Sequence, residues 1–360
     1  MNESDSKISR GIFYLLIFMG IILAGTILKI MRSVLQPVVL SILLSFVFYP
    51  FIKKLNEKCK IPWVLAIVII YAVFFVIFYL IANMLTVSLM SIIEVYPRYE
   101  ERFLIIYGKL QHSFTENSNL FKFFNFNEEQ TLIENINKEL NILPFLKNFA
   151  VNFTGSIVTF TKNAFLVFLM SIFLLLEMKF TKNKIYTAFN GTNKEKIHGI
   201  MHSIALDTAH YVSIKFFISL ATGSLVFLCS LLAGIDFPFV WGFVAFLLNF
   251  VPTFGSIISC ALTILFTIVQ FYPSPFPIVF ISIAVVTINL ILGNILEPRI
   301  EGENLGISPF VILVSLSIWG WLWGFLGLIL AVPLMVIIKI FCENISYLNP
   351  IAVLLGSGKK

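Results

Sequence analysis

Long apolar runs are the feature that most limits what this sequence can fold into. A helix needs about 20 largely apolar residues to cross roughly 30 Å of hydrocarbon. Because 59% of the residues are hydrophobic and 12% are charged, a soluble fold could not bury the apolar surface. We therefore predict an all-α, polytopic integral membrane protein with membrane lipid as a partner and about eight transmembrane helices. The predicted spans are Ile12–Leu28, Val34–Ile52, Trp63–Ile92, Val151–Leu176, Val212–Leu232, Val240–Gln270, Phe276–Leu296 and Pro309–Phe341.

Clusters of lysine indicate which loops face the cytoplasm. Four lysines lie in Lys53–Lys60, five lie in Lys179–Lys196, and the chain ends in Lys359 and Lys360. Since cytoplasmic loops are enriched in Lys and Arg, both termini are expected in the cytoplasm. The net charge of +6 comes from such loops and not from a basic groove, so no nucleic-acid partner is predicted.

The polarity of the sequence divides the chain into three parts. Residues 1–93 hold the first three spans, residues 94–150 form a polar insert, and residues 151–360 form a C-terminal transmembrane domain. Within the insert, apolar residues between Leu132 and Leu140 recur at helical spacing after Asn127, a suitable N-cap. We expect the insert to be a small helical lobe on the extracytoplasmic side.

Two of the predicted spans are too long to be simple crossings. Val240–Gln270 has 31 residues and Pro309–Phe341 has 33, so straight helices would be about 46 and 50 Å long. Pro252 lies near the middle of the first segment and Gly324 near the middle of the second. Both segments are therefore either broken, as in re-entrant hairpins, or long tilted helices with glycines at packing positions.

The two long segments also resemble each other. Pro238 corresponds to Pro309 and Gly255 to Gly327, at offsets of 71 and 72 residues. Matched interruptions of this kind are typical of transporters built from repeats, which handle solute where broken helices expose backbone groups.

Polar residues near these interruptions are candidates for a transport path. The densest group follows Asn294, where Glu297 and Arg299 would be costly in hydrocarbon. The alternative is an ordinary interfacial loop, and chemistry alone favours that loop. The candidates for a path or gate are Asn249, Pro252, Gly255, Asn289, Asn294, Glu297, Arg299 and Gly302. The candidates for structural breaks are Pro298, Pro309, Gly324, Gly327 and Pro333.

Other polar residues are expected to have structural roles. Lys215 should extend to the cytoplasmic interface, and Asp236 should belong to a turn. His198 and His202 share a helix face, but Asp207 points away from them, so no metal site is predicted. The sequence contains no phosphate-binding loop, nucleophile elbow or dinucleotide motif, and neither an enzyme activity nor a cofactor is expected.

Two motifs resemble those of a known family. Asn249–Ser256 matches the family pattern N-x-I-P-x-x-G with Val251 in place of Ile. Asn294–Leu334 matches a second family pattern, in which Pro298, Gly302, Ser308-Pro309, Gly324, Gly327 and Pro333 follow one another in the same order and spacing. Together they are similar to the autoinducer-2 exporter (AI-2E) family of bacterial membrane proteins. The likeness extends over most of the chain, but Ile214-Lys215 stands where the family often has Gly-Gln.

The resemblance implies a transporter in the bacterial cytoplasmic (inner) membrane that exports small hydrophilic molecules, such as autoinducer-2, or lets them permeate. It also implies a homo-oligomer. Two alternatives stay open: a sodium(lithium)/proton antiporter, for which Glu297 is the best-placed carboxylate, and a scaffold that assembles other membrane proteins without transporting a solute.

Overall fold

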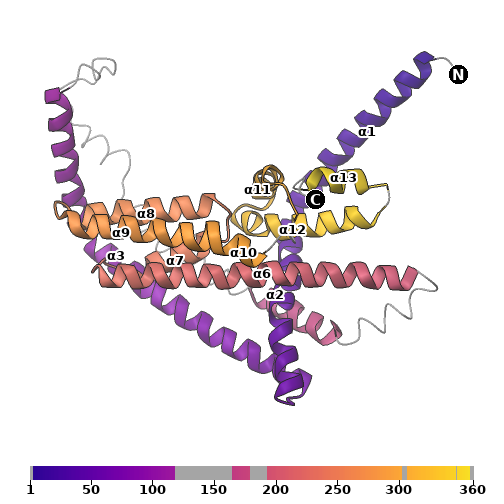
Figure 1. The fold of residues 1–360 in the computed structure, drawn as a ribbon, viewed down its shortest axis with the longest axis horizontal. Helices are drawn as coiled ribbons and strands as arrows, with labels where there is room; N and C mark the ends of the chain where they lie inside the picture. Colours follow the sequence, from indigo (N-terminus) through magenta and orange to yellow (C-terminus); the bar gives the residue numbers. More distant parts are fainter. Residues whose placement is uncertain (1–2, 118–163, 179–192, 302–305, 346, 357–360) are drawn as a thin grey trace. The chain divides into compact units, whose positions relative to one another are not determined.

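The structure, a computed structural model, describes residues 3–117, 164–178, 193–301, 306–345 and 347–356. Regular structure in these ranges is helical (Figure 1), apart from one isolated β-bridge between Ile307 and Gly356. In chain order the helices are α1 (Glu3–Ile30), α2 (Arg32–Lys58), α3 (Trp63–Asn117), a helix at Ala164–Met178, α6 (Asn193–Leu232), α7 (Pro238–Leu248), α8 (Phe254–Phe271), α9 (Pro275–Asn289), the π-helix η2 (Leu290–Leu296), α10 (Glu297–Glu301), α11 (Pro309–Trp323), α12 (Phe325–Asn344) and α13 (Asn349–Leu355).

Six of the described helical segments are long and apolar enough to cross a membrane, by length and composition. They are Arg32–Lys58, Trp63–Ile92, Ser203–Leu232, Phe254–Phe271, Pro275–Ile300 and Phe325–Asn344. Most of their residues are not buried within the chain, so lipid has to cover the apolar side chains that remain exposed. The predicted all-α, polytopic membrane fold is confirmed.

The helices form two compact units, each assembled from separate parts of the sequence. The first contains Met1–Ile70, Asn163–Ser213 and Glu301–Lys360, and the second contains Tyr71–Lys162 and Ile214–Ile300. Helix α3 continues without a break from the third predicted span to Asn117, so the beginning of the polar insert extends that span. The rest of the insert, including the helix expected after Asn127, lies outside the described residues.

In the second unit, the predicted span Val240–Gln270 is a helical hairpin. Helix α7 ends at Leu248 and α8 begins at Phe254, which confirms the interruption beside Pro252. With 11 residues, α7 is about 16 Å long, too short to cross hydrocarbon. The end of α8 returns to the start of α7, because Gln270 Nε2 donates to the Gly234 carbonyl at 3.0 Å and the Asp236 N–H donates to Gln270 Oε1 at 2.9 Å. The hairpin therefore begins and ends at the same end of α6.

Glycine permits the close packing of this hairpin. A Cβ atom on Gly255 would lie 1.7 Å from the Leu248 carbonyl oxygen, so the first turn of α8 touches the backbone of α7. Gly223 and Gly242 meet where α6 and α7 cross, and a Cβ on either would lie 2.7 Å from the carbonyl oxygen of the other. Small residues at such crossings are characteristic of packed membrane helices.

In the first unit, the predicted span Pro309–Phe341 is a second hairpin. Gly324, at a φ of 66°, separates α11 from α12, and a Cβ on Gly327 would lie 1.8 Å from the Trp319 carbonyl oxygen. The Ser315 hydroxyl ties the two helices together by donating to the Ala331 carbonyl at 2.9 Å. Because α7 and α11 both start with proline, the sequence echo corresponds to two similar hairpins, one in each unit.

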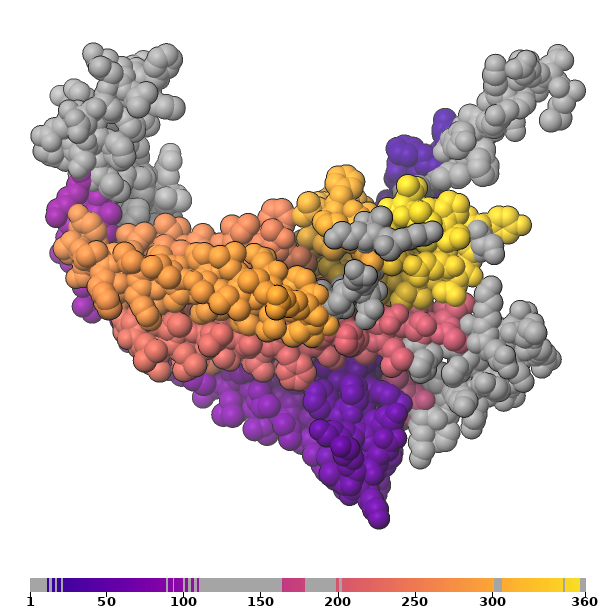
Figure 2. Space-filling view, in the orientation of Figure 1, coloured from indigo at the N-terminus to yellow at the C-terminus, as the bar shows by residue number. Residues whose placement is uncertain are grey.

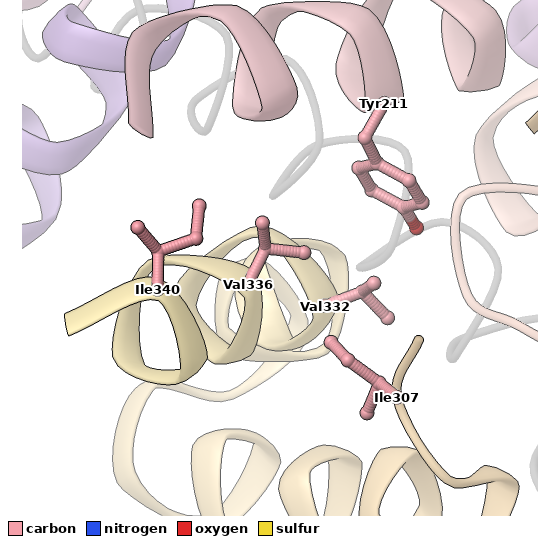
Figure 3. Close-up of a cluster of buried hydrophobic side chains, with 5 residues drawn as sticks. All are labelled: Tyr211, Ile307, Val332, Val336 and Ile340. Atoms are coloured by element: carbon pink, nitrogen blue, oxygen red, sulfur yellow. The ribbon is translucent and has the colours of Figure 1, made fainter. Parts of the chain in front are cut away.

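Apolar contacts hold the second hairpin within its unit. Val332, Val336 and Ile340 lie along one face of α12 and pack against Tyr211 of α6 and Ile307 (Figure 3). At the other end of the hairpin, Trp323 Nε1 donates to the Leu28 carbonyl at 3.1 Å, and Gln36 Nε2 donates to the Trp323 carbonyl at 3.0 Å. The tip of the hairpin is thereby bound to the corner between α1 and α2.

Two of the predicted breaks do not interrupt a helix. Pro333 lies inside α12, which continues to Asn344; one missing N–H removes one hydrogen bond, and close packing around buried Leu330 and Val332 keeps the helix intact. Pro298 was expected to end a helix, but the helical path continues through η2 and α10 to Glu301.

Candidate functional site

A buried ion pair lies inside the second unit. Lys215 Nζ of α6 donates to Glu297 Oε1 of α10 at 2.5 Å, and the exposed fractions of the two side chains are 5% and 13%. The prediction that Lys215 extends to the interface is therefore wrong. Glu297 lies in a helix and not in the loop that chemistry alone favoured. Charged groups in membrane segments are costly, so they normally pair with each other and line functional paths.

The elements that carry the pair run antiparallel. Ile214 and Ile218 of α6 pack against Leu292 of η2 and Ile288 of α9, and Val226 further along α6 packs in one cluster with Ile281 of α9. Helix α9 therefore lies along α6, as the ribbon in Figure 1 and the space-filling drawing in Figure 2 show. Helical periodicity directs Ile214 and Ile218 toward η2 and places Lys215 one residue further around the helix. The same contact between helices therefore brings Lys215 to Glu297, although they are 82 residues apart in sequence.

A π-helix leads directly to the acidic member of the pair. The Glu297 N–H bonds to the Leu292 carbonyl, five residues earlier, so the turn before Glu297 is wider than an α-helical turn. Pro298 follows and has no N–H to donate. In an α-helix, its ring would collide with the carbonyl of the residue four positions earlier, and the wider turn relieves this contact. Short π-helical segments occur frequently at functional sites.

The broken hairpin contributes a second polar contact beside the pair. Asn249, at the end of α7, is 5% exposed, and its Nδ2 donates to the Ser219 hydroxyl oxygen at 3.0 Å. Ser219 follows Lys215 by four residues, so the two side chains lie on one face of α6 in successive turns. The hairpin tip and the ion pair are thus neighbours along the same buried face.

Asn289 provides a third polar position, at the junction of α9 and η2. Its Nδ2 donates to the Val285 carbonyl at 2.9 Å and to Cys260 Sγ at 3.1 Å. Its Oδ1 is buried and has no hydrogen-bond partner among the described residues. A buried acceptor without a partner costs free energy, so this atom is suited to accept a hydrogen bond from water or a solute.

Comparison with known proteins identifies the family. The sequence pattern of the AI-2E family of transporters matches residues 12–347. This chain belongs to the AI-2E family. It is similar to a protein of Borreliella burgdorferi that is provisionally named a transport protein, with 32% identity over 97% of this chain and 91% of the relative. It is also similar to the AI-2 transport protein TqsA of Escherichia coli, with 29% identity over 94% of each chain.

Membership of the AI-2E family makes this chain a multi-pass membrane transport protein of bacterial type. A Haemophilus influenzae relative, also provisionally named a transport protein, is 29% identical over 93% of each chain. The family match, over residues 12–347, includes both hairpins and both members of the ion pair.

The structure brings together only some of the residues predicted for the path of this AI-2E transporter. Glu297 and Asn249 reach the same face of α6, and Pro252 and Gly255 shape the hairpin turn beside them. Asn294 and Arg299 are exposed on the outside of η2 and α10. Gly302 lies outside the described residues.

Sequence reasoning missed Lys215 and Ser219 as site residues. One signal was present: Lys215, Ser219 and Thr222 recur at spacings of four and three residues within an apolar segment, which is the pattern of a polar stripe on one helix face. All three are buried. Glu297, the partner of Lys215, could not be identified from α6 alone.

A second polar cluster fixes the opposite end of the unit. The Tyr99 hydroxyl donates to Asp236 Oδ2, and Arg102 donates to the Gln270 carbonyl. Burial raises the pKa of Tyr99, and the hydrogen bond to Asp236 raises it further, so the hydroxyl keeps the proton it donates. The cluster binds α3 to the loop after α6 and to the end of α8. Lys215 lies several turns away, nearer the middle of α6.

Replacement of Asn249 with alanine should destabilise the hairpin. The change removes the Nδ2 donor and leaves a buried polar site incomplete, which costs about 1–3 kcal/mol. We expect a lower unfolding temperature in detergent, measured by intrinsic fluorescence. Ser317→Ala serves as the control, because Ser317 is exposed and its hydroxyl donates only to the carbonyl four residues earlier in its own helix. Equal unfolding temperatures for both variants would show that the Asn249 contact contributes nothing.

Proposed function

We propose that this protein exports, or lets permeate, a small hydrophilic solute such as autoinducer-2. The observation that carries the proposal is the buried contact between the broken hairpin and α6, where Asn249 and Ser219 lie one turn from the Lys215–Glu297 pair. Polar groups of this kind, inside an otherwise apolar unit, offer hydrogen bonds to a solute that has left water. A relative whose name assigns it to AI-2 transport supports the choice of solute.

The ion pair that Glu297 forms with Lys215 favours this proposal over cation/proton exchange. An antiporter needs a carboxylate whose proton competes with the transported cation. Glu297 is mostly buried, as that mechanism would require, but its Oε1 accepts a bond from the Lys215 ammonium. A bound cation would have to displace this ammonium group, so Glu297 is better suited to hold Lys215 than to bind sodium.

The proposal is tested with purified protein in sealed liposomes. We expect saturable efflux of autoinducer-2 in the absence of any ion gradient, since no described feature requires coupling. Sodium-dependent acidification of the lumen, without solute efflux, would replace the proposal with the antiporter. Absence of both activities from folded protein would favour the scaffold.

The proposed setting is the bacterial cytoplasmic membrane, with both termini in the cytoplasm and several copies of the chain in one oligomer. In this orientation Asp236 is at the outer end of α6, and the first hairpin enters from outside and returns there. Glu297 then lies toward the cytoplasmic side, as the contact with Lys215 near the start of the predicted span requires.

Labelling of Cys59 tests this orientation. Cys59 is a free, exposed cysteine at the end of α2, within the lysine-rich segment. A membrane-impermeant maleimide should label it only after spheroplasts are permeabilised. As the matched control, Ile30→Cys in a Cys59→Ser background should react in intact spheroplasts, because Ile30 is exposed at the end of α1, next to the start of α2 and far along α2 from Cys59. The reverse pattern would place the termini outside.

A further inference from the structure

The buried pair has a charge balance that selects the solutes able to approach it. Lys215 and Glu297 carry one positive and one negative charge, and their side chains are 5% and 13% exposed. Besides the buried phenol of Tyr211, the charged or titratable side chains that the structure describes near them on α6 and α10 are Asp207, His210 and Arg299, and these three are exposed. The described part of this site is therefore neutral overall, with both of its charges withdrawn from water.

Electrostatics then distinguishes between classes of solute. An anion that binds Lys215 displaces Glu297, and the site is left with a net negative charge in a medium of low dielectric constant. A cation that binds Glu297 leaves a net positive charge for the same reason. A solute that carries both charges pairs with both residues, and the site stays neutral. One ion pair is replaced by two, which offsets the cost of separating Lys215 from Glu297.

We propose that the Lys215–Glu297 pair is a binding site for small zwitterionic solutes, with the anionic group of the solute on Lys215 and its ammonium group on Glu297. This assignment rests on the proposed transport function and adds to it a second solute class, since autoinducer-2 has no ammonium group. Asn249 and Ser219, one turn further along α6, provide hydrogen bonds to the rest of the solute. Glu297 is held by a five-residue helix after a π-helix, a short element that can shift to admit the solute.

Three probes of similar size separate the charge classes. Taurine carries an ammonium and a sulfonate group, isethionate has a hydroxyl in place of the ammonium, and ethanolamine has a hydroxyl in place of the sulfonate. Uptake of each is measured in liposomes of phosphatidylglycerol, whose head group is not zwitterionic and cannot occupy the site. Protein-free liposomes give the background. We expect taurine uptake to exceed that of either analogue by about tenfold or more, which corresponds to 1.4 kcal/mol.

Variants of the pair should change this preference in opposite directions. Glu297→Gln leaves Lys215 without its partner and should favour isethionate, whereas Lys215→Gln should favour ethanolamine. The double variant Lys215→Gln/Glu297→Gln contains no buried charge and remains a valid test if the single variants fold poorly; it should lose the preference for taurine. Lys53→Gln/Glu57→Gln removes an exposed ion pair and should keep the preference.

The outcomes separate this inference from the proposed function. Equal uptake of the three probes, or a preference unchanged in the double variant, would overturn the zwitterion site. If autoinducer-2 flux persists in the same liposomes, the proposed function stands while the zwitterion site fails. If autoinducer-2 flux is absent but taurine uptake depends on the pair, the proposed solute is wrong and the site is supported.

Discussion

Replacement of Lys215 with methionine should destabilise the protein more than the simultaneous replacement of Lys215 and Glu297. The single change leaves the Glu297 carboxylate buried without its partner, which costs roughly 3–5 kcal/mol. The double variant Lys215→Met/Glu297→Gln removes both charges, and the loss of a buried ion pair as a whole costs much less. Unfolding temperatures in detergent for the wild type, both single variants and the double variant form the double-mutant cycle that measures this coupling.

The matched control is the ion pair between Lys53 and Glu57 on α2. These side chains are 51% and 62% exposed, and their charged atoms are 3.9 Å apart. An exposed pair four residues apart on a helix contributes only about 0.3–0.5 kcal/mol. Lys53→Met should therefore leave the unfolding temperature nearly unchanged. Additive effects of Lys215→Met and Glu297→Gln would mean that the two residues do not pair within the folded unit.

Replacement of Gly255 or Gly327 with alanine should prevent correct formation of the corresponding hairpin. The added methyl groups would lie 1.7 and 1.8 Å from backbone carbonyl oxygens, and backbone atoms cannot rotate away as a side chain can. Overpacking usually costs about 1–3 kcal/mol and more where the neighbours are rigid. We expect each variant to reach the membrane in small amounts and to elute as aggregate in size-exclusion chromatography.

Gly25→Ala is the control, because it should leave the stability of the protein unchanged or raise it. Among the described residues, no atom outside the neighbouring turns of α1 lies within 4 Å of a Cβ on Gly25. This residue is inside α1, where alanine is a better helix former by about 1 kcal/mol. The variant should be produced at wild-type levels and should unfold at the same or a higher temperature. Normal yields of Gly255→Ala and Gly327→Ala would show that the two helices of each hairpin are further apart than the structure places them.

The sequence allowed much of the fold to be predicted, because the controlling residues act locally. Pro252 and Gly324 indicated the interruptions, and Pro238 and Pro309 indicated the repeated helix starts. The return of the first hairpin to its own starting end was not predictable in this way. It depends on the bonds from Gln270 to Gly234 and Asp236, which join parts of the chain that no local pattern connects.

The candidate site was less predictable, because its main contact joins distant residues. Glu297 was identified by the cost of a charge near an apolar segment, and Asn249 by its position beside the interruption. Lys215 was assigned to the interface because an isolated lysine near the end of a span usually extends to water. A partner 82 residues away reverses that assignment, and the π-helix that positions the partner has no distinct sequence signal.

The π-helix before Glu297 also bears on how such a site can arise. A π-helical segment accommodates one residue more than the α-helix it interrupts, so a single-residue insertion into α9 is sufficient to create it. Each residue corresponds to about 100° of rotation in an α-helix, and the wider turn absorbs the rotation of the added residue. If the same residues formed an uninterrupted α-helix, position 297 would be turned by about that angle from its present direction. The backbone form of this short segment therefore decides whether the carboxylate at position 297 reaches Lys215.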